Sequence, residues 1–314
     1  DGTIQQLTKY PEAKHRWGGW SHDGEQFAFT SNRRDESVFD VYVHDRDAAS
    51  EAAELVFEGD GWLSVAGWSP DDSRLIVSQA YSGYDQDLYV LEIATGEIDH
   101  LTPHEGTIRY SSPSWGPDGE NLYVVTDRAT DTLRLERLEV STGDLSVVET
   151  VGTDYHERDE WNVAGVAIDD DSRRIVYGRN VDGYTEWTSG ELTGVDRIDP
   201  LPTPDLPRGV SGGVSFGPDG DRFAVTATSS TDNANIYVVD VTTGESERWT
   251  DAPTAGIPRE TFVAPELVHY PTFDGREIPA FFSLPDDETG TGETPVIVDI
   301  HGGPESQRRP SFSS

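Results

Sequence analysis

The chain repeats itself about every fifty residues, and this repeat constrains its fold more than any other feature. In each repeat one large apolar side chain stands directly before, or just inside, a short polar turn. These five anchors lie 48, 47, 53 and 48 residues apart and are Trp20, Trp68, Trp115, Ile168 and Phe216. A period near fifty is typical of propeller proteins, in which each repeat forms one blade.

Each repeat contains two turn signals that separate short runs of β-branched and aromatic residues. The first turn reads Ser-Pro-Asp-Asp or Gly-Pro-Asp-Gly, and it occurs at residues 69–72, 116–119 and 217–220. Proline presets φ at the second position of such a turn. The second turn is a Thr-Gly pair, which occurs at residues 95–96, 142–143, 193–194 and 243–244. The pattern predicts four antiparallel strands in each repeat.

A four-stranded sheet of about fifty residues cannot bury both of its faces alone, so we expect blades packed face to face around a central channel. The fold class is therefore all-β, a β-propeller with five complete repeats. Residues 1–8 match the turn and outer strand at 95–102, which predicts one orphan strand at the start. We expect the tryptophan anchors to fill the interfaces between blades rather than to bind a ligand. The number of blades in a whole ring stays open.

Composition narrows the function. The formal net charge is -36, and the only lysines are Lys9 and Lys14. A nucleic-acid partner needs a basic patch, which this sequence does not offer. No run approaches the roughly 20 apolar residues of a membrane-spanning helix. Acidic blocks such as residues 169–171 lack the spaced pattern of a calcium loop, so we expect neither a metal nor a cofactor. Cysteine is absent, which favours a cytoplasmic location without disulfides.

The repeat pattern breaks near residue 251, and a different pattern follows. Residues 262–285 predict two strands around an Asp-Gly turn, and residues 296–300 predict a buried parallel strand. We therefore divide the chain into a propeller, 1–255, and a second domain, 256–314. Next come His301, Gly302, Gly303 and Pro304. Two adjacent glycines let backbone N–H groups point at a developing oxyanion, although a simple tight turn has the same sequence.

The order of propeller, hairpin, apolar strand and His-Gly-Gly-Pro resembles the prolyl oligopeptidase family of serine peptidases, which includes acylaminoacyl peptidases and dipeptidyl aminopeptidase-like enzymes. Residues 20–32 also resemble the TolB-type propeller repeat. The family resemblance implies an α/β-hydrolase domain, of which residues 256–314 would be only the first strands. It implies short peptides, or acyl- and aminoacyl-peptides, as substrates, which the propeller would admit selectively. Gly302 and Gly303 would form the oxyanion hole, and His301 and Pro304 would organise its loop.

The resemblance places the catalytic Ser, Asp and His after the oxyanion loop, where only ten residues remain. We therefore expect no nucleophile, base or orienting acid in this chain, and no activity from it alone. Residues 209–213 match Gly-x-Ser-x-Gly, but no apolar strand precedes them and no helix pattern follows. We expect Ser211 to be structural.

Two other functions compete with the peptidase. A stand-alone TolB-like binding propeller would explain residues 1–250 but not the segment from 262 to 312. A propeller-type polysaccharide lyase would need a cluster of His and acidic metal ligands, which the sequence does not show. The apolar strand 296–300 would also lack neighbours. Three outcomes are open for this strand, namely disorder, docking on the propeller and self-association with another copy of the chain.

The acidic, lysine-poor composition is typical of proteins from extreme halophiles, in which salt screens the repulsion that opposes compaction. The Debye length falls to about 3 Å at 1 M salt. We predict that circular dichroism in a potassium chloride series will show the native spectrum only at high salt. A complete native spectrum in dilute buffer would contradict the halophile interpretation.

Overall fold

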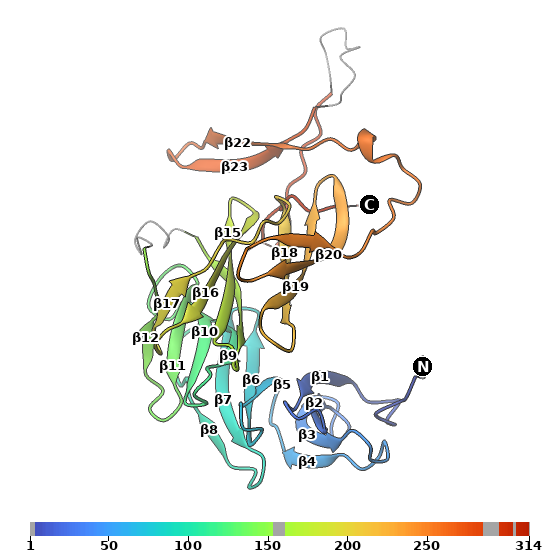
Figure 1. Cartoon of the computed structure of the whole chain (residues 1–314), viewed down its shortest axis with the longest axis vertical. Coiled ribbons are helices and arrows are strands. Elements are labelled where there is room, and N and C mark those ends of the chain that lie inside the picture. Colours follow the sequence, from blue (N-terminus) through green and yellow to red (C-terminus); the bar gives the residue numbers. More distant parts are fainter. Residues whose placement is uncertain (1–3, 153–160, 285–294, 304–305, 314) are drawn as a thin grey trace. The chain divides into compact units, whose positions relative to one another are not determined.

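The computed structural model describes residues 4–152, 161–284, 295–303 and 306–313, and its regular structure is almost entirely β-strand. Five antiparallel blades follow one another along the chain and form a β-propeller (Figure 1). Blade 1 comprises β1 (His15–Trp20), β2 (Gln26–Ser31), β3 (Asp40–Asp45) and β4 (Glu54–Phe57). Blade 2 comprises β5 (Leu63–Trp68), β6 (Arg74–Ser82), β7 (Asp85–Glu92) and β8 (Ile98–His100). Blade 3 comprises β9 (Tyr110–Trp115), β10 (Asn121–Thr126), β11 (Arg134–Glu139) and β12 (Leu145–Val147).

Blade 4 carries one strand that the repeat pattern does not predict. Its own strands are β14 (Val163–Asp169), β15 (Arg174–Val181), β16 (Tyr184–Leu192) and β17 (Arg197–Pro200). A two-residue strand, β13 (Glu149–Thr150), continues from blade 3 and pairs in parallel with the outer strand β17. Blade 5 comprises β18 (Val210–Phe216), β19 (Arg222–Ser229), β20 (Asp232–Asp240) and β21 (Ser246–Arg248). A 3-10 turn (Arg259–Thr261) and a hairpin of β22 (Glu266–Pro271) and β23 (Glu277–Phe282) follow.

The turn signals form the tight turns that the sequence predicts. In blade 2 the N–H of Asp72 donates to the carbonyl of Ser69 at 2.8 Å, and Asp72 has a φ of 57°. The corresponding turn of blade 3 ends at Gly119, with a φ of 66°. The Ser69 hydroxyl, and to a lesser degree Ser73, holds the pKa of Asp71 at about 2, against a burial effect that raises it. Each of these turns joins the first two strands of its blade.

The tryptophan anchors of blades 2 and 3 fill the blade interfaces, as predicted. Trp68 is only 4% exposed and packs in one cluster with Ala28 and Val43 of blade 1. Trp115 is 5% exposed and packs against Ile76 of blade 2. Trp20 differs, because it is 43% exposed and lies against aromatic side chains of its own blade. Among the described residues, no strand of a preceding blade lies over Trp20.

Two predicted strands do not form. Residues 4–10, which include the expected orphan strand, contain no strand in the structure. The apolar run 296–300 also lacks strand pairing, and its side chains are exposed; Ile297, for example, is 92% exposed. The physical reason is the same in both cases. A strand needs a paired neighbour for its N–H and C=O groups, and among the described residues no strand pairs with either segment.

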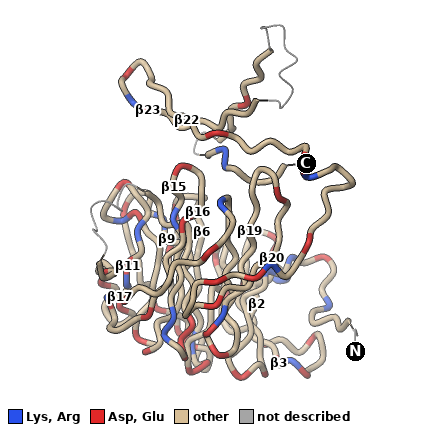
Figure 2. Tube along the Cα trace, turned by 45° about the horizontal axis from the view of Figure 1, so that its top comes forward, with Lys and Arg blue, Asp and Glu red and all other residues tan. Residues whose placement is uncertain are grey.

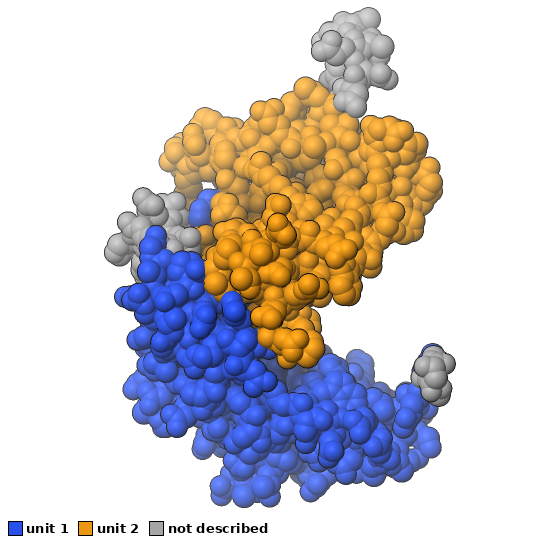
Figure 3. Space-filling model, viewed as in Figure 1, with its two compact units in different colours: residues 1–177, 190–200 blue, residues 178–189, 201–314 orange. Residues whose placement is uncertain are grey.

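The chain divides into two compact units (Figure 3). Unit 1 consists of residues 1–177 and 190–200, and unit 2 of residues 178–189 and 201–314. The tip of the β15–β16 hairpin therefore belongs to the same unit as blade 5 and β22–β23. The domain boundary between 255 and 256 stays a prediction. Acidic residues occur along the trace of both units (Figure 2).

We predict that Trp68→Ala will lower the free energy of unfolding by about 3 to 5 kcal/mol, because it leaves a large cavity between blades 1 and 2. Urea unfolding at constant high salt measures this change. The matched control is Trp249→Ala, because Trp249 is 62% exposed. Equal losses for the two variants would show that Trp68 does not hold the blades together.

Candidate functional site

The first strands of blades 1 to 4 bring the anchors to one cavity of unit 1. Successive first strands β1, β5, β9 and β14 lie side by side. The cavity at their turn ends has a volume of about 240 Å³. Its lining includes Trp20, Trp68, Trp115, His22 and Asp170. In a propeller the first strand of each blade faces the central channel, so this cavity lies at one mouth of that channel.

A histidine joins three blades at this mouth. His22 lies in the β1–β2 turn, and its Nδ1 is 2.7 Å from Oδ1 of Asp72 in blade 2. Its Nε2 is 3.4 Å from Oδ2 of Asp170 in blade 4. The His22 side chain is 44% exposed, so these contacts contribute little to stability. They do join the turns of blades 1, 2 and 4 at the rim of this cavity.

The two buried tryptophans of the mouth differ in their hydrogen bonding. Trp68 Nε1 donates to the carbonyl of Gly19 at 3.1 Å. The Nε1 of Trp115 is buried and has no hydrogen-bond partner among the described residues. A buried indole N–H without an acceptor costs free energy, so Trp115 serves the packing between blades 2 and 3 at the expense of one hydrogen bond.

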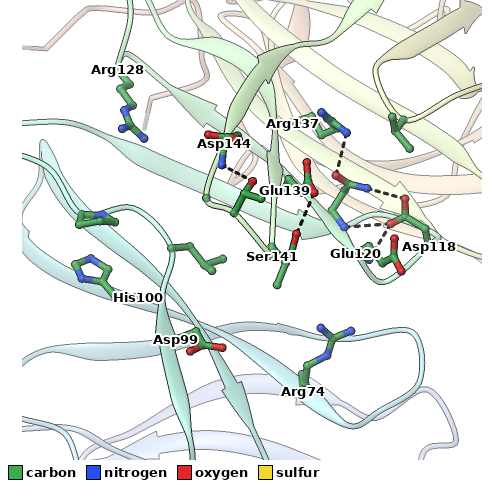
Figure 4. A pocket seen from close by; sticks show the side chains of 17 residues that line it. Arg74, Asp99, His100, Asp118, Glu120, Arg128, Arg137, Glu139, Ser141 and Asp144 are labelled. Atoms are coloured by element: carbon green, nitrogen blue, oxygen red, sulfur yellow. Dashed lines mark hydrogen bonds between the residues drawn. The ribbon is translucent and has the colours of Figure 1, made fainter.

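A larger groove of about 920 Å³ lies between blades 2 and 3 (Figure 4). Arg74, Arg128 and Arg137 contribute its cationic groups, and His100 also lines it. Carboxylates outnumber them and are those of Asp99, Asp118, Glu120, Glu139 and Asp144. The Ser141 hydroxyl donates to Oε1 of Glu139 at 3.0 Å, so its oxygen is engaged in a local turn rather than with a base. The groove is a polar surface of mixed charge.

A buried polar cluster sits at the edge of blade 2. Asp87 is 6% exposed, and its carboxylate accepts hydrogen bonds from Thr102 Oγ1 at 3.2 Å and Tyr81 Oη at 3.1 Å. His104 Nδ1 lies 3.1 Å from the same carboxylate, and its Nε2 lies 3.0 Å from Asp85. Burial alone would lower the pKa of His104. The Thr102 carbonyl and the two carboxylates outweigh burial and raise that pKa.

Equivalent polar residues occupy the start of the third strand in other blades. Asp40 is fully buried, and its carboxylate accepts from the backbone N–H of Gly59 at 2.9 Å. Asn235 accepts from the N–H of Ala252 at 2.7 Å. Each of these side chains ties the third strand to the connection that leaves its blade. The sequence signal is the polar residue that precedes Val-Tyr-Val, Leu-Tyr-Val or Ile-Tyr-Val in blades 1, 2 and 5, to which the sequence analysis assigned no role.

The predicted oxyanion loop is open to solvent in the described residues. His301, Gly302 and Gly303 are exposed, and a Cβ added at Gly302 would meet no atom within 4 Å. The His301 ring nitrogen Nδ1 lies 3.0 Å from the carbonyl of Gly302. Pro304 lies outside the described residues. The assignment of Gly302 and Gly303 as oxyanion donors stays a prediction.

Ser211 lies within strand β18, not on a turn between a strand and a helix. Its hydroxyl oxygen accepts from Trp187 Nε1 at 2.7 Å, and its N–H donates to Thr185 Oγ1 at 3.0 Å. These bonds link blade 5 to the tip of the β15–β16 hairpin within unit 2. The geometry is that of a structural serine.

Within the described ranges, His, Asp and Glu side chains nowhere gather as three or more that could hold a metal ion. The same part of the chain contains no helix of the length and apolar character needed to cross a membrane.

Comparison with known proteins identifies the propeller. The model of the TolB β-propeller domain matches residues 4–184, which is more than half of the chain. The chain belongs to the TolB β-propeller family. It is similar to the Tol-Pal system protein TolB of Francisella tularensis subsp. mediasiatica, with 29% identity over 106 residues. That match covers 33% of this chain and 23% of the relative. The corresponding protein of subsp. holarctica is 31% identical over 91 residues, which are 29% of this chain and 20% of that protein.

Solved structures of prolyl peptidases share the fold of this TolB-family chain. One comes from a study of two prolyl endopeptidases and has a TM-score of 0.67 and 20% identity. The match covers 88% of this chain and 40% of the chain in that structure. Prolyl oligopeptidase B from Galerina marginata has a TM-score of 0.63 and 15% identity, over 83% of this chain and 37% of its own. The chain thus spans less than half the length of these structures. At such identities the likeness shows the fold alone.

We predict that His104 stabilises the protein in a pH-dependent way. Its folded pKa is raised above the ordinary value of 6.5, so its contribution is fully present below the unfolded pKa and disappears as pH rises through the folded value. The difference in unfolding free energy between wild type and His104→Gln should therefore shrink between about pH 6 and pH 9. Urea unfolding across this range tests it. Ile4→Ala, at a side chain that is 96% exposed and does not titrate, should show no such trend, and a flat difference for His104→Gln would refute the prediction.

Proposed function

We propose that this chain is the propeller, with the opening segment of the catalytic domain, of a serine peptidase of the prolyl oligopeptidase family. The observation that carries the proposal is the extent of the fold likeness to prolyl endopeptidases. The likeness covers 88% of this chain, which is a larger part than residues 1–255 make up. The likeness therefore includes part of the segment that carries the hairpin β22–β23 and His301-Gly302-Gly303.

The proposed chemistry is attack of an activated serine on a peptide or acyl carbonyl. Backbone N–H groups of Gly302 and Gly303 would hold the oxyanion, a contribution worth on the order of 10²-fold or more in rate per donor. The serine, the histidine base and the orienting aspartate would be supplied from outside residues 1–314. The described residues hold none of these three groups in a catalytic arrangement.

The propeller would restrict access to that site. Its channel mouth is small, and His22 joins the turns of blades 1, 2 and 4 across it. Short peptides, including acyl- and aminoacyl-peptides, are the substrates that fit such a gate. We also propose a cytoplasmic enzyme of a halophile, on the composition alone.

A binding propeller of the TolB type is the second candidate. The match of residues 4–184 to the TolB β-propeller domain favours it. This candidate assigns no role to His301, Gly302 and Gly303.

The test is labelling by a fluorophosphonate, which modifies activated serines. We predict that the full product of the natural gene is labelled at a serine outside residues 1–314 and hydrolyses acyl-aminoacyl nitroanilides. The 314-residue chain alone should be neither labelled nor active. An unlabelled full product would overturn the peptidase proposal, and stoichiometric labelling of Ser211 would overturn its structural role.

A further inference from the structure

The tip of the β15–β16 hairpin binds the segment that follows His301-Gly302-Gly303. The guanidinium of Arg309 reaches this tip, where its Nε donates to the carbonyl of Gly183 at 2.8 Å. Its Nη2 donates to Thr185 Oγ1 at 3.1 Å. All of these residues belong to unit 2. Gly183 has a φ of +86°, and an added Cβ would lie 3.2 Å from Phe281 of β23, so the tip is closely covered.

Arg309 is held by neutral groups rather than by a carboxylate. It forms no ion pair with a carboxylate of the described residues, although the sequence contains 59 acidic residues. Burial lowers its pKa, which means that the charge is partly removed from water. Two hydrogen bonds, one to a carbonyl and one to a hydroxyl, fix the position and orientation of this guanidinium. They do not neutralise its charge.

The neighbours of Arg309 continue the contact with the propeller. Pro310 is buried, and the N–H of Phe312 donates to Thr228 Oγ1 of blade 5 at 3.2 Å. The Phe312 ring meets Phe262 edge-on, with 5.1 Å between centroids. On the other side, Asn180 Nδ2 donates to Gln307 Oε1 at 2.8 Å.

The loop that contains the two glycines is closed at its base. Arg308 forms an ion pair with Asp299, so the residues on either side of the loop are joined. Arg309 follows directly and is anchored to the hairpin tip. Gly303 lies six residues before Arg309, which limits how far the loop can move from the tip.

We propose that residues 180–185 are a docking site that positions His301-Gly302-Gly303, and that Arg309 is the positioning residue. The positioning of oxyanion donors rests on the proposed peptidase function. The docking of Arg309 on residues 180–185 does not. A propeller that fixes the oxyanion donors would couple the gate to the chemistry of the enzyme, because the donors must be held within about 0.5 Å of the positions from which they can bond to the oxyanion.

Docking is tested on this chain by amide hydrogen exchange of residues 306–313. In the wild type we expect protection of the Phe312 amide. In Arg309→Gln its exchange should be faster by roughly tenfold or more, because the segment is released. Arg309→Lys, which keeps the charge but not the fork of two donors, should be intermediate. Arg276→Gln is the control, because Arg276 is 81% exposed in the β22–β23 turn. Unprotected wild-type residues, or equal exchange in Arg309→Gln, would overturn the docking site.

Positioning is tested on the full gene product. Arg309→Gln should lower kcat by roughly tenfold or more with little change in KM, which is the signature of an interaction made in the transition state. Arg309→Lys should restore part of kcat, and Arg276→Gln should have no effect. Normal kcat in Arg309→Gln, with docking lost, would overturn positioning. A full product without peptidase activity would instead overturn the proposed function and leave the exchange result to decide the docking site.

Discussion

The structure depends on the burial of one sheet face by the next blade. A four-stranded sheet of fifty residues leaves apolar side chains on both faces, and the core clusters show where they go. Trp68, at the end of β5, lies in a cluster whose other members come partly from blade 1. Trp115 does the same one blade later. Each blade is therefore stable only beside its neighbour, and the turns, the channel mouth and the interblade groove all take their positions from this stacking.

The sequence predicted the elements that depend on local chemistry. The Pro-Asp turns of blades 2, 3 and 5 and the Tyr-Val third strands of blades 1, 2 and 5 are local signals, and the strand order within these blades agrees with the pattern. The prediction was wrong where a strand depends on a partner that the chain does not place beside it. Residues 4–10 and 296–300 have strand-like sequences but no neighbour among the described residues. The two-residue strand β13 was missed for the opposite reason, because it has a partner but almost no sequence signal.

The candidate sites divide in the same way. His301, Gly302 and Gly303 were found from a motif, and their role in an oxyanion hole stays a prediction. The channel-mouth contacts of His22 join residues about fifty and one hundred and fifty positions apart, which only the fold brings together. The buried Asp87 was visible as a recurring polar residue, yet its partners Thr102, Tyr81 and His104 could not be assigned before the connection between blades 2 and 3 was known.

The short strand β13 has a consequence for motion in the propeller. Its backbone pairs Glu149 with Arg197, so a hydrogen-bonded ladder, and not only side-chain packing, crosses the boundary between blades 3 and 4. Side-chain contacts can slide and re-form, whereas a ladder must break its bonds before the blades separate. Blades 3 and 4 should accordingly move as one body. Any motion of unit 1 that widens the channel should then occur at the boundary between another pair of blades.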